Sequence, residues 1–350
     1  MDKTDDGMTM QDVARSLGVS VSTVSLALSG NKVVAAATRE RVRLEAERLG
    51  YVYNRRAASL RKSSRNLVGL VVPDITNPFA AEAALGLQNA EVLDGHMVAL
   101  SNTREQIQLQ TEILTTLIEE RATGIVLIPA IGTQASDLQI LIRSGMPTVL
   151  MNRDVPESGL SFLGADDDAI IRCAVGHLVA THHVGTAAYF GGLAAASPRQ
   201  SRSRLFGEYL AGMGVANDKT WDIPTPPNAQ AAYESALTRF QTGPLPDGVL
   251  CHSDSIALGF LRALAVVGGK QRKCAVIGID GIAAGRIATP SLTTVGVYPG
   301  RMGAEAGRLL LSQAKPISQP TDREDLEPAL VLRESCGCEP DLMSQGRVPR

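Results

Sequence analysis

The chain has 350 residues, of which 44% are hydrophobic and 20% charged, and its formal net charge at pH 7 is −2. A chain of this length and composition is expected to fold around sizeable cores in more than one domain. No basic segment followed by an apolar run opens it, and no apolar stretch reaches the ~18–20 residues that cross a bilayer, which predicts neither secretion nor membrane insertion. The five scattered cysteines favour reduced thiols in a cytoplasmic protein.

Charge is distributed unevenly along the chain. Residues 1–65 hold 12 Lys and Arg against 7 Asp and Glu, whereas the remainder holds 22 against 29. A basic head on an acidic body is typical of a protein whose head binds nucleic acid.

Two short helix patterns near the start are separated by Gly18-Val19-Ser20. Thr9 and Asp12 have capping-box spacing for the first helix, and Ser20 is a cap signal for the second. In the second helix, the pattern predicts an inward face and an outward face. The inward residues are Val21, Val24, Ala27 and Leu28, and the outward residues are Ser22, Thr23, Ser25 and Leu26. A third helix is expected from about 38 to 49. This is the layout of a helix-turn-helix, whose second helix enters the major groove of DNA; the alternative is an ordinary amphipathic helix.

Beyond residue 66, strand and helix patterns alternate. Strands are expected at 67–73, 97–101, 124–129, 148–151, 186–190, 248–251 and 274–279. Helices are expected at 78–93, 105–120, 134–144, 167–181, 200–213, 229–241 and 254–267. Alternation of this kind predicts an α/β fold with doubly wound parallel sheets, and the number of strands predicts two such lobes. Ligands of these sheets bind beyond the carboxyl ends of the strands, which here means a cleft between the lobes.

Several motifs together resemble one known family. They are Asp12-Val13-Ala14, Gly18-Val19-Ser20, Thr23-Val24-Ser25, Leu49-Gly50-Tyr51 with Asn54, Val72 to Phe79, Ser253 to Gly259, and Pro290 to Val295. Over roughly residues 9–335 the chain resembles the LacI family of bacterial transcription factors, and within it most resembles the maltose-regulon repressor type.

The resemblance implies a domain plan. A three-helix head would span 1–53, a hinge 54–65, a two-lobed periplasmic-binding-protein-like body 66–335, and a tail 336–350. The N-terminal lobe would comprise 66–164 and 293–320. The C-terminal lobe would comprise 165–292 and 321–335, with a last strand at 330–334.

For the DNA interface, the resemblance assigns base reading chiefly to Val21, Ser22 and Leu26. Leu26 departs from the usual arginine, so the bidentate guanine contact is lost. The full set of expected DNA-binding residues is Thr9, Ser20, Val21, Ser22, Thr23, Ser25, Leu26, Asn31, Tyr51, Asn54, Arg55, Ala57 and Leu60. The segment from Arg55 to Leu60 is too short to be helical alone in water. In the family it folds on DNA and a leucine matching Leu60 wedges into the minor groove, with Ala57 packed beside it; the alternative is a flexible basic linker.

For a small-molecule effector, the resemblance assigns Arg204 and Asp280 in the C-terminal lobe. A guanidinium and a carboxylate suit the hydroxyls of a sugar or a similar solute. The other expected lining residues are Asp74, Asn77, Phe79 and Ser253. Asp254 is expected to cap a helix rather than touch ligand, and Asn77 also suits the turn before Pro78.

Neither a metal nor a cofactor is expected. His177, His182 and His183 lie close together in sequence, but their spacing favours surface or packing roles. The pair Cys336-Gly337-Cys338 has no histidine nearby in sequence, which favours free thiols at a strand end. No phosphate-binding loop follows Gly191-Gly192.

Taken together, the resemblance implies a homodimeric repressor, not an enzyme, that binds double-stranded DNA at a near-palindromic operator. An effector in the cleft, which a carbohydrate would suit, would act as inducer or corepressor by favouring one of two states. The competing hypothesis is a cytoplasmic sugar-binding or sugar-processing protein without regulatory DNA binding.

Overall fold

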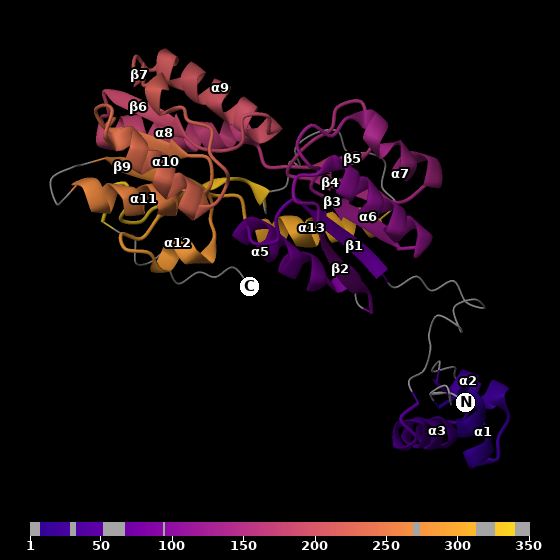
Figure 1. Cartoon of the computed structure of the whole chain (residues 1–350). Coiled ribbons are helices and arrows are strands. Elements are labelled where there is room, and N and C mark those ends of the chain that lie inside the picture. Colours follow the sequence, from indigo (N-terminus) through magenta and orange to yellow (C-terminus); the bar gives the residue numbers. More distant parts are fainter. Residues whose placement is uncertain are drawn as a thin grey trace, which may run out of the picture. The chain divides into compact units, whose positions relative to one another are not determined.

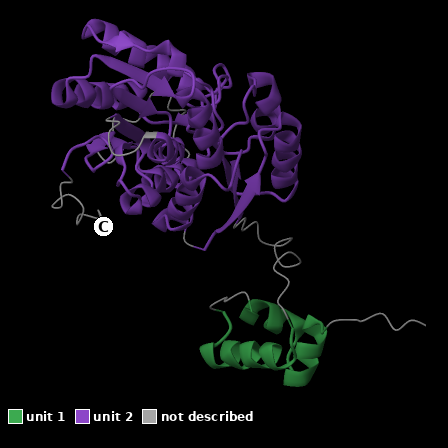
Figure 2. Cartoon of the chain, turned by 60° about the vertical axis from the view of Figure 1, so that its left-hand side comes forward, with its two compact units in different colours: residues 1–65 green, residues 66–350 purple. Residues whose placement is uncertain are grey.

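The computed structural model describes residues 8–28, 33–51, 67–93, 95–268, 274–312 and 326–339. They belong to two compact units, one within residues 1–65 and one within residues 66–350 (Figure 2). Among these residues, no helix is both long enough and apolar enough to span a bilayer.

The described residues of the first unit form three helices, which are α1 (Met10–Leu17), α2 (Val21–Leu28) and α3 (Ala36–Arg48). The predicted caps are confirmed. The Asp12 carboxylate accepts from the backbone N–H of Thr9 at 3.0 Å, and Ser20 Oγ accepts from the backbone N–H of Thr23 at 3.1 Å. Gly18 ends α1 in the left-handed conformation, at a φ of 66°. A small apolar core joins the helices; its buried members are Val13, Ala14, Val24, Ala27, Val34, Val42 and Ala46.

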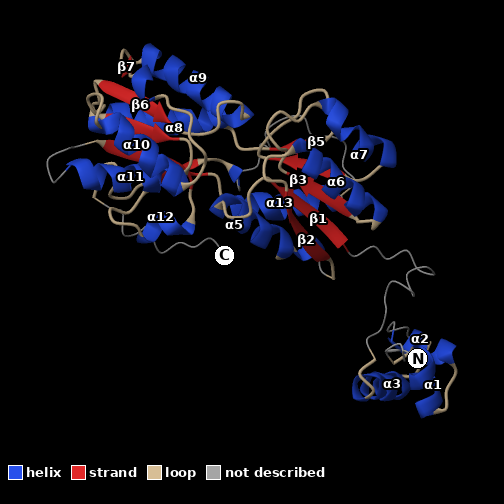
Figure 3. Cartoon of the chain, viewed as in Figure 1, coloured by secondary structure: helices blue, strands red, loops and turns tan. Residues whose placement is uncertain are grey.

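The N-terminal lobe of the second unit contains a parallel sheet in the order β2-β1-β3-β4-β5 (Figure 3). Its strands are β1 (Leu67–Val72), β2 (Met97–Asn102), β3 (Gly124–Leu127), β4 (Thr148–Met151) and β5 (Ser161–Leu163). Its helices are α5 (Pro78–Gln88), η1 (Glu91–Leu93), α6 (Ile107–Glu119), η2 (Ala135–Leu138), α7 (Gln139–Ser144) and the later α13 (Pro299–Leu311). Alternate residues of β1 face opposite layers. Val71 packs with the core under α6 and α7, whereas Leu70 and Val72 pack with the core that includes α5 and α13.

The described residues of the C-terminal lobe form a six-stranded sheet in the order β11-β10-β9-β8-β6-β7. Its strands are β6 (Thr186–Phe190), β7 (Ala216–Asn217), β8 (Gly248–Cys251), β9 (Ala275–Asp280), β10 (Thr293–Gly296) and β11 (Ala329–Val331). Its helices are α8 (Asp167–His182), α9 (Ser197–Gly212), η3 (Lys219–Trp221), α10 (Ala229–Phe240), α11 (Asp254–Gly268) and α12 (Ala283–Ile287). Tyr189 packs on the side of α8 and α9, and its neighbour Phe190 packs on the side of α10 and α11. The doubly wound, two-lobed α/β architecture is therefore confirmed.

The return to the N-terminal lobe differs from the expected one. The sequence assigns 293–320 to that lobe, but β10 pairs in parallel with β9 and so belongs to the C-terminal sheet. Among the described residues from 293 to 312, only α13 returns to the N-terminal lobe, where it packs closely on α5 (Figure 1). A Cβ atom added to Gly303 would lie 2.0 Å from the carbonyl oxygen of Ala83. The boundary between the lobes therefore falls between β10 and α13.

The segment after β11 also differs from the expected tail. β11 is antiparallel to β10 and shorter than the expected strand at 330–334. The chain then packs into the C-terminal lobe, where the backbone N–H of Ser335 donates to Ser291 O at 2.9 Å and Cys336 is 3% exposed. The two cysteines are free thiols, as predicted, but the fold brings a histidine that is distant in sequence beside them, because His177 Nε2 lies 3.5 Å from Cys336 Sγ.

Candidate functional site

A cavity lies between the two lobes, at the carboxyl ends of their strands, where the α/β pattern predicts it. The N-terminal lobe contributes residues that follow β1 and β4. The C-terminal lobe contributes residues that follow β6 and β8, the end of β9 and one side of α9. The lining residues are Asn77, Phe79, Asn152, Arg153, Leu193, Ala196, Pro198, Arg202, Pro227, His252, Ser253 and Asp280. Polar groups from both lobes therefore converge on one space that also has apolar walls.

Arg202 carries the guanidinium that α9 directs to this cavity. Its side chain is 6% exposed, and its Nε donates to Asp167 Oδ1 at 2.6 Å. The assignment of this role to Arg204 is wrong, because Arg204 is 60% exposed and pairs with Glu208 at 2.8 Å. Helical spacing gives the physical reason. Arg202, Phe206 and Leu210 recur every four residues on the buried face, and Arg204 is about 200° further around the helix.

Asp280 ends β9 and, as predicted, lines the cavity. It is 7% exposed, and its backbone has a φ of 132°. Burial, reinforced by the charge of Asp254, raises the pKa of the Asp280 carboxyl well above its ordinary value. A ligand group that donates a hydrogen bond to Asp280 would offset the cost of burying its charge.

Asp254 supports the loop that follows Asp280. It is the first residue of α11, fully buried, and not among the lining residues of the described chain. Its Oδ2 accepts from the backbone N–H groups of Gly281 and Ile282 at 2.8 and 2.9 Å, and its Oδ1 accepts from Thr294 Oγ1 at 2.6 Å. Burial, opposed by these hydrogen bonds, raises the pKa of Asp254 to about 6. Asp254 therefore positions the loop after Asp280 and does not itself line the cavity.

His252 and Ser253 lie between β8 and α11. Ser253 lines the cavity, as predicted, and its Oγ accepts from the backbone N–H of Ile256 at 3.4 Å. His252 is a lining residue that the sequence reasoning missed, and its Nδ1 lies 2.7 Å from Tyr189 Oη. Burial, with the nearby charge of Arg202, lowers the pKa of His252 well below its ordinary value, so the imidazole is neutral at pH 7. Its position directly after a buried strand is the signal that would have found it.

The N-terminal lobe contributes Asn77 and Phe79, both of which were predicted. Asn77 also caps α5, since its Oδ1 accepts from the backbone N–H of Phe79 at 3.0 Å, so the turn role and the lining role coexist. The third predicted residue, Asp74, is not among the lining residues of the described chain. Its Oδ1 instead accepts from the backbone N–H and the hydroxyl of Thr76 at 2.9 and 2.7 Å. A short carboxylate in a turn commonly accepts hydrogen bonds from the residue two positions later.

Asn152 and Arg153 are further lining residues that the sequence reasoning missed. They follow β4 directly. Arg153 is held by Glu105, at 2.9 Å, and by the carbonyl oxygen of Pro129, at 3.0 Å. Its side chain is 13% exposed. A polar pair immediately after a buried strand is the signal that would have found them.

In the first unit, α2 presents three neighbouring side chains to solvent. Val21 is 41% exposed, Leu26 is 37% exposed and Ser22 is also exposed. The expectation that Val21 packs inward is wrong, because Val21 begins the helix and the buried face of α2 consists of Val24 and Ala27. Val21, Ser22 and Leu26 are the positions to which the resemblance assigns base reading.

The other expected DNA-binding residues have varied surroundings. Ser20 and Thr23 bond to each other at the start of α2, with their hydroxyl oxygens 2.8 Å apart. Thr9 caps α1, Ser25 is half-buried, and Tyr51 packs against the core of the unit. The remaining ones, Asn31, Asn54, Arg55, Ala57 and Leu60, lie outside the described residues.

Two family models match the chain. Residues 9–54 match the bacterial regulatory proteins of the lacI family, and residues 175–336 match the periplasmic binding protein-like domain. The chain is 29% identical to the ribose operon repressor of Halalkalibacterium halodurans, over 93% of this chain and 96% of that protein. It is 28% identical to the maltose regulon regulatory protein MalI of Escherichia coli, over 77% and 78%.

Two solved structures have a similar fold. The lac repressor dimer bound to operator and the anti-inducer ONPF has a TM-score of 0.80 at 21% identity, over 95% of this chain and 99% of that one. The transcriptional regulator CelR in complex with cellobiose has a TM-score of 0.66 at 28% identity, over 94% and 99%. With the lacI-family head, the periplasmic-binding-protein-like body and full-length relatives in agreement, the chain has the domains of a LacI-family bacterial regulatory protein.

Proposed function

We propose that this protein is a dimeric, sequence-specific transcriptional repressor controlled by a small polyhydroxylated ligand, most simply a sugar. α2 would read bases in the major groove, residues 54–65 would act as the hinge, and the ligand would bind between the lobes. The observation that carries this proposal is the cavity, which brings the Arg202 guanidinium, the Asp280 carboxylate and the Ser253 hydroxyl to one space.

A sugar fits this set of groups. Its hydroxyls both donate and accept, so they can donate to Asp280 and accept from Arg202 and Arg153. The apolar face of the ring would lie against Phe79 or Pro227, which line the same cavity. The names of a ribose operon repressor and of a cellobiose complex among the similar proteins support a carbohydrate.

Ligand binding is tested by a thermal-shift screen of the full-length protein against pentoses, hexoses and disaccharides. A ligand at 100 times its Kd stabilises the folded state by ~2.7 kcal/mol, which gives a measurable increase in Tm. If none of these compounds stabilises the protein, a carbohydrate ligand is excluded.

DNA recognition is tested by selecting binding sites from a random DNA pool. We expect inverted half-sites, because a two-fold symmetric dimer binds a two-fold symmetric site. Leu26→Arg should shift one position of each half-site toward guanine, since a bidentate arginine contact discriminates by ~1–3 kcal/mol.

The control for this shift is Leu44→Arg, which adds the same charge at an exposed position of α3. It should raise the affinity for all DNA without changing the selected site. Unchanged half-sites with Leu26→Arg would mean that Leu26 does not face bases. Failure to select any sequence would favour the competing hypothesis of a sugar-binding protein without regulatory DNA binding.

A further inference from the structure

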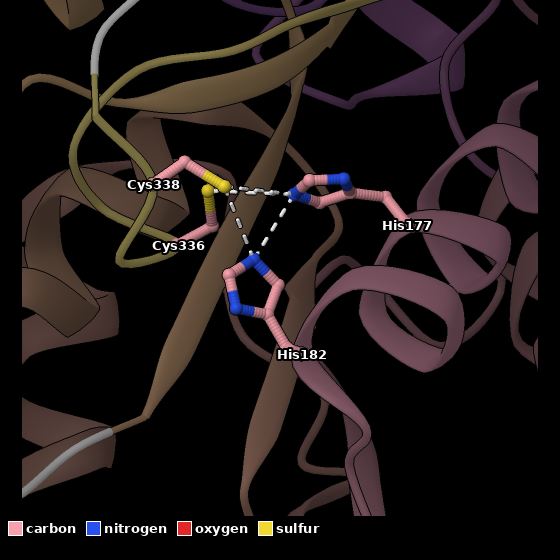
Figure 4. A group of neighbouring side chains, drawn as sticks. All are labelled: His177, His182, Cys336 and Cys338. Atoms are coloured by element: carbon pink, nitrogen blue, oxygen red, sulfur yellow. Dashed lines mark hydrogen bonds between the residues drawn. The ribbon is translucent and has the colours of Figure 1, made fainter.

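Four side chains that can bind metal meet at the end of α8 that is remote from the cavity (Figure 4). His177 and His182 come from α8, and Cys336 and Cys338 come from the segment after β11. Their ligand atoms all lie within 4.8 Å of one another. In Figure 4 the two sulfur atoms and one nitrogen of each ring point toward a common centre.

Four of the six distances between the ligand atoms are close to those of a tetrahedral metal site. The two Nε2 atoms lie 3.1 Å apart. His177 Nε2 lies 3.5 Å from Cys336 Sγ and 3.8 Å from Cys338 Sγ, and His182 Nε2 lies 3.5 Å from Cys338 Sγ. Zn–N bonds of about 2.0–2.1 Å and Zn–S bonds of about 2.3 Å in a tetrahedron place the ligand atoms about 3.3–3.8 Å apart.

We propose that His177, His182, Cys336 and Cys338 form a structural site for a thiophilic divalent cation, for which Zn²⁺ is the best fit. A tetrahedral set of two thiolates and two imidazoles is typical of zinc. Binding would displace one proton from each thiol, so that two thiolates balance the charge of the cation. Four protein ligands leave no open position, which makes the role structural rather than catalytic.

The local backbone supports this arrangement. Gly337 adopts a φ of 94°, which a residue with a side chain rarely takes, and this turn places both cysteines on the same side of the segment. Ser335, just before them, is tied to the sheet, because its Oγ donates to Val276 O at 2.7 Å and accepts from the backbone N–H of Thr293 at 2.8 Å. The ligands are therefore held by two elements, α8 and the segment that Ser335 ties to β9 and β10 of the C-terminal sheet.

The site would fasten the last described segment of the chain to α8. The first residue of the same helix, Asp167, pairs with Arg202 at the cavity. The 16 residues from Asp167 to His182 span about 22 Å of helix. The cation would thus stabilise the C-terminal lobe at a distance from the ligand.

Metal content of the full-length protein, produced without a polyhistidine tag and under reducing conditions, is the direct test. After incubation with Zn²⁺ and removal of excess metal, mass spectrometry of the elements should find one zinc ion per chain. Cys338→Ser and His182→Asn should each reduce this content by about tenfold or more. Cys173→Ser and His183→Asn are the matched controls, because both residues belong to the same helical region but lie outside the cluster; they should retain the zinc.

Visible absorption of bound Co²⁺ is a second test, and it uses the parent protein alone. Co²⁺ added to the parent protein should produce the visible absorption of a tetrahedral thiolate site, and Zn²⁺ should abolish it. A chelator should lower the Tm of the parent but not that of a folded Cys338→Ser variant. The proposal is overturned if the reduced parent binds no metal, if Cys338→Ser retains it, or if Cys336 and Cys338 are found as a disulfide that excludes it.

Discussion

Arg202 and Arg204 stand two residues apart on α9 in opposite surroundings, which provides a matched pair of variants. Arg202→Lys keeps a positive charge but removes the planar donor fork. Loss of a hydrogen bond in which one partner is charged costs about 1.5–3 kcal/mol, or about 10–150-fold in affinity. We therefore expect Arg202→Lys to weaken ligand binding by this factor, as measured by calorimetry with a sugar that stabilises the parent.

Arg204→Lys should change the same affinity by less than about twofold, because an exposed ion pair contributes little. Equal losses in the two variants would contradict the placement of the ligand beside Arg202. A loss of ligand affinity in Arg204→Lys alone would support the sequence-based prediction that Arg204 binds the effector.

Asp280 predicts a pH dependence of stability. An unfolded aspartate has a pKa of about 3.9, and burial raises the pKa of the folded Asp280 well above that. The folded state therefore retains a proton that the unfolded state has lost, and this contribution to the free energy of unfolding disappears as the pH rises from about 4 through the folded pKa.

Asp280→Asn has no such proton. Its free energy of unfolding minus that of the parent should therefore increase over this pH range, by about 1.4 kcal/mol for each unit of pKa shift. Urea denaturation of both proteins between pH 4 and 8 measures it. A difference that stays constant with pH would show that Asp280 is solvated in the folded protein.

Two of the cavity-lining residues could be predicted from the sequence because they directly follow predicted strands. Asp280 and Ser253 follow predicted strands, and both line the cavity. Arg202 was missed because a short arginine motif fits two positions, and only the buried spacing of Phe206 and Leu210 chooses between them. The Cys-His cluster was missed because 159 residues separate His177 from Cys336, and contacts of the segment after β11 with β9 and β10 bring them together.

Among the elements, the contact of α13 with α5 depends on glycine. A Cβ on Gly303 would lie 2.0 Å from Ala83 O, and one on Gly86 would lie 1.7 Å from Gly300 O. Gly303→Ala should therefore force the helices apart, at a cost of about 1–3 kcal/mol. We expect a Tm several degrees lower, which calorimetry or circular dichroism would detect.

Gly176→Ala is the matched control. Gly176 is also helical, in α8, but a Cβ there meets no atom within 4 Å. Alanine should then stabilise the helix by about 0.5–1 kcal/mol, because it restricts the unfolded chain. If both variants had the same Tm, close helix packing would not explain the glycine at position 303.

Buried apolar runs such as β1 and β8 were predicted from the sequence, and β10 was not. Its first residues, Thr293 and Thr294, look polar but are fully buried. Their hydroxyl groups are satisfied by Arg333 O, at 3.0 Å, and by Asp254 Oδ1, at 2.6 Å. Both partners are 40 residues away in sequence, so local periodicity does not reveal that the strand is buried.

At the scale of the whole molecule, the uneven charge along the chain suits the proposed division of labour. The basic residues of 1–65 would attract phosphates, while the acidic body would discourage other contacts with DNA. Within α3, however, Arg43 pairs with Glu40 and Glu47, and Arg48 pairs with Glu45. The net charge of the head therefore overstates the number of arginines available to DNA.

The proposed repressor makes one further prediction about the whole molecule, which follows from thermodynamic linkage. If the ligand changes operator affinity by some factor, the operator must change ligand affinity by the same factor, typically about 5–150-fold. Operator titrations with and without ligand, and ligand titrations with and without operator, measure both factors.

Arg202→Lys should weaken ligand binding but leave operator affinity without ligand unchanged, because Arg202 belongs to the second unit and α2 to the first. Each factor is the affinity with the other partner divided by the affinity without it. An inducer would give factors below one and a corepressor factors above one, and in either case the two factors must agree. If the ligand binds and operator affinity does not change, the cavity and the DNA-binding helix are not coupled, and ligand control of repression is refuted.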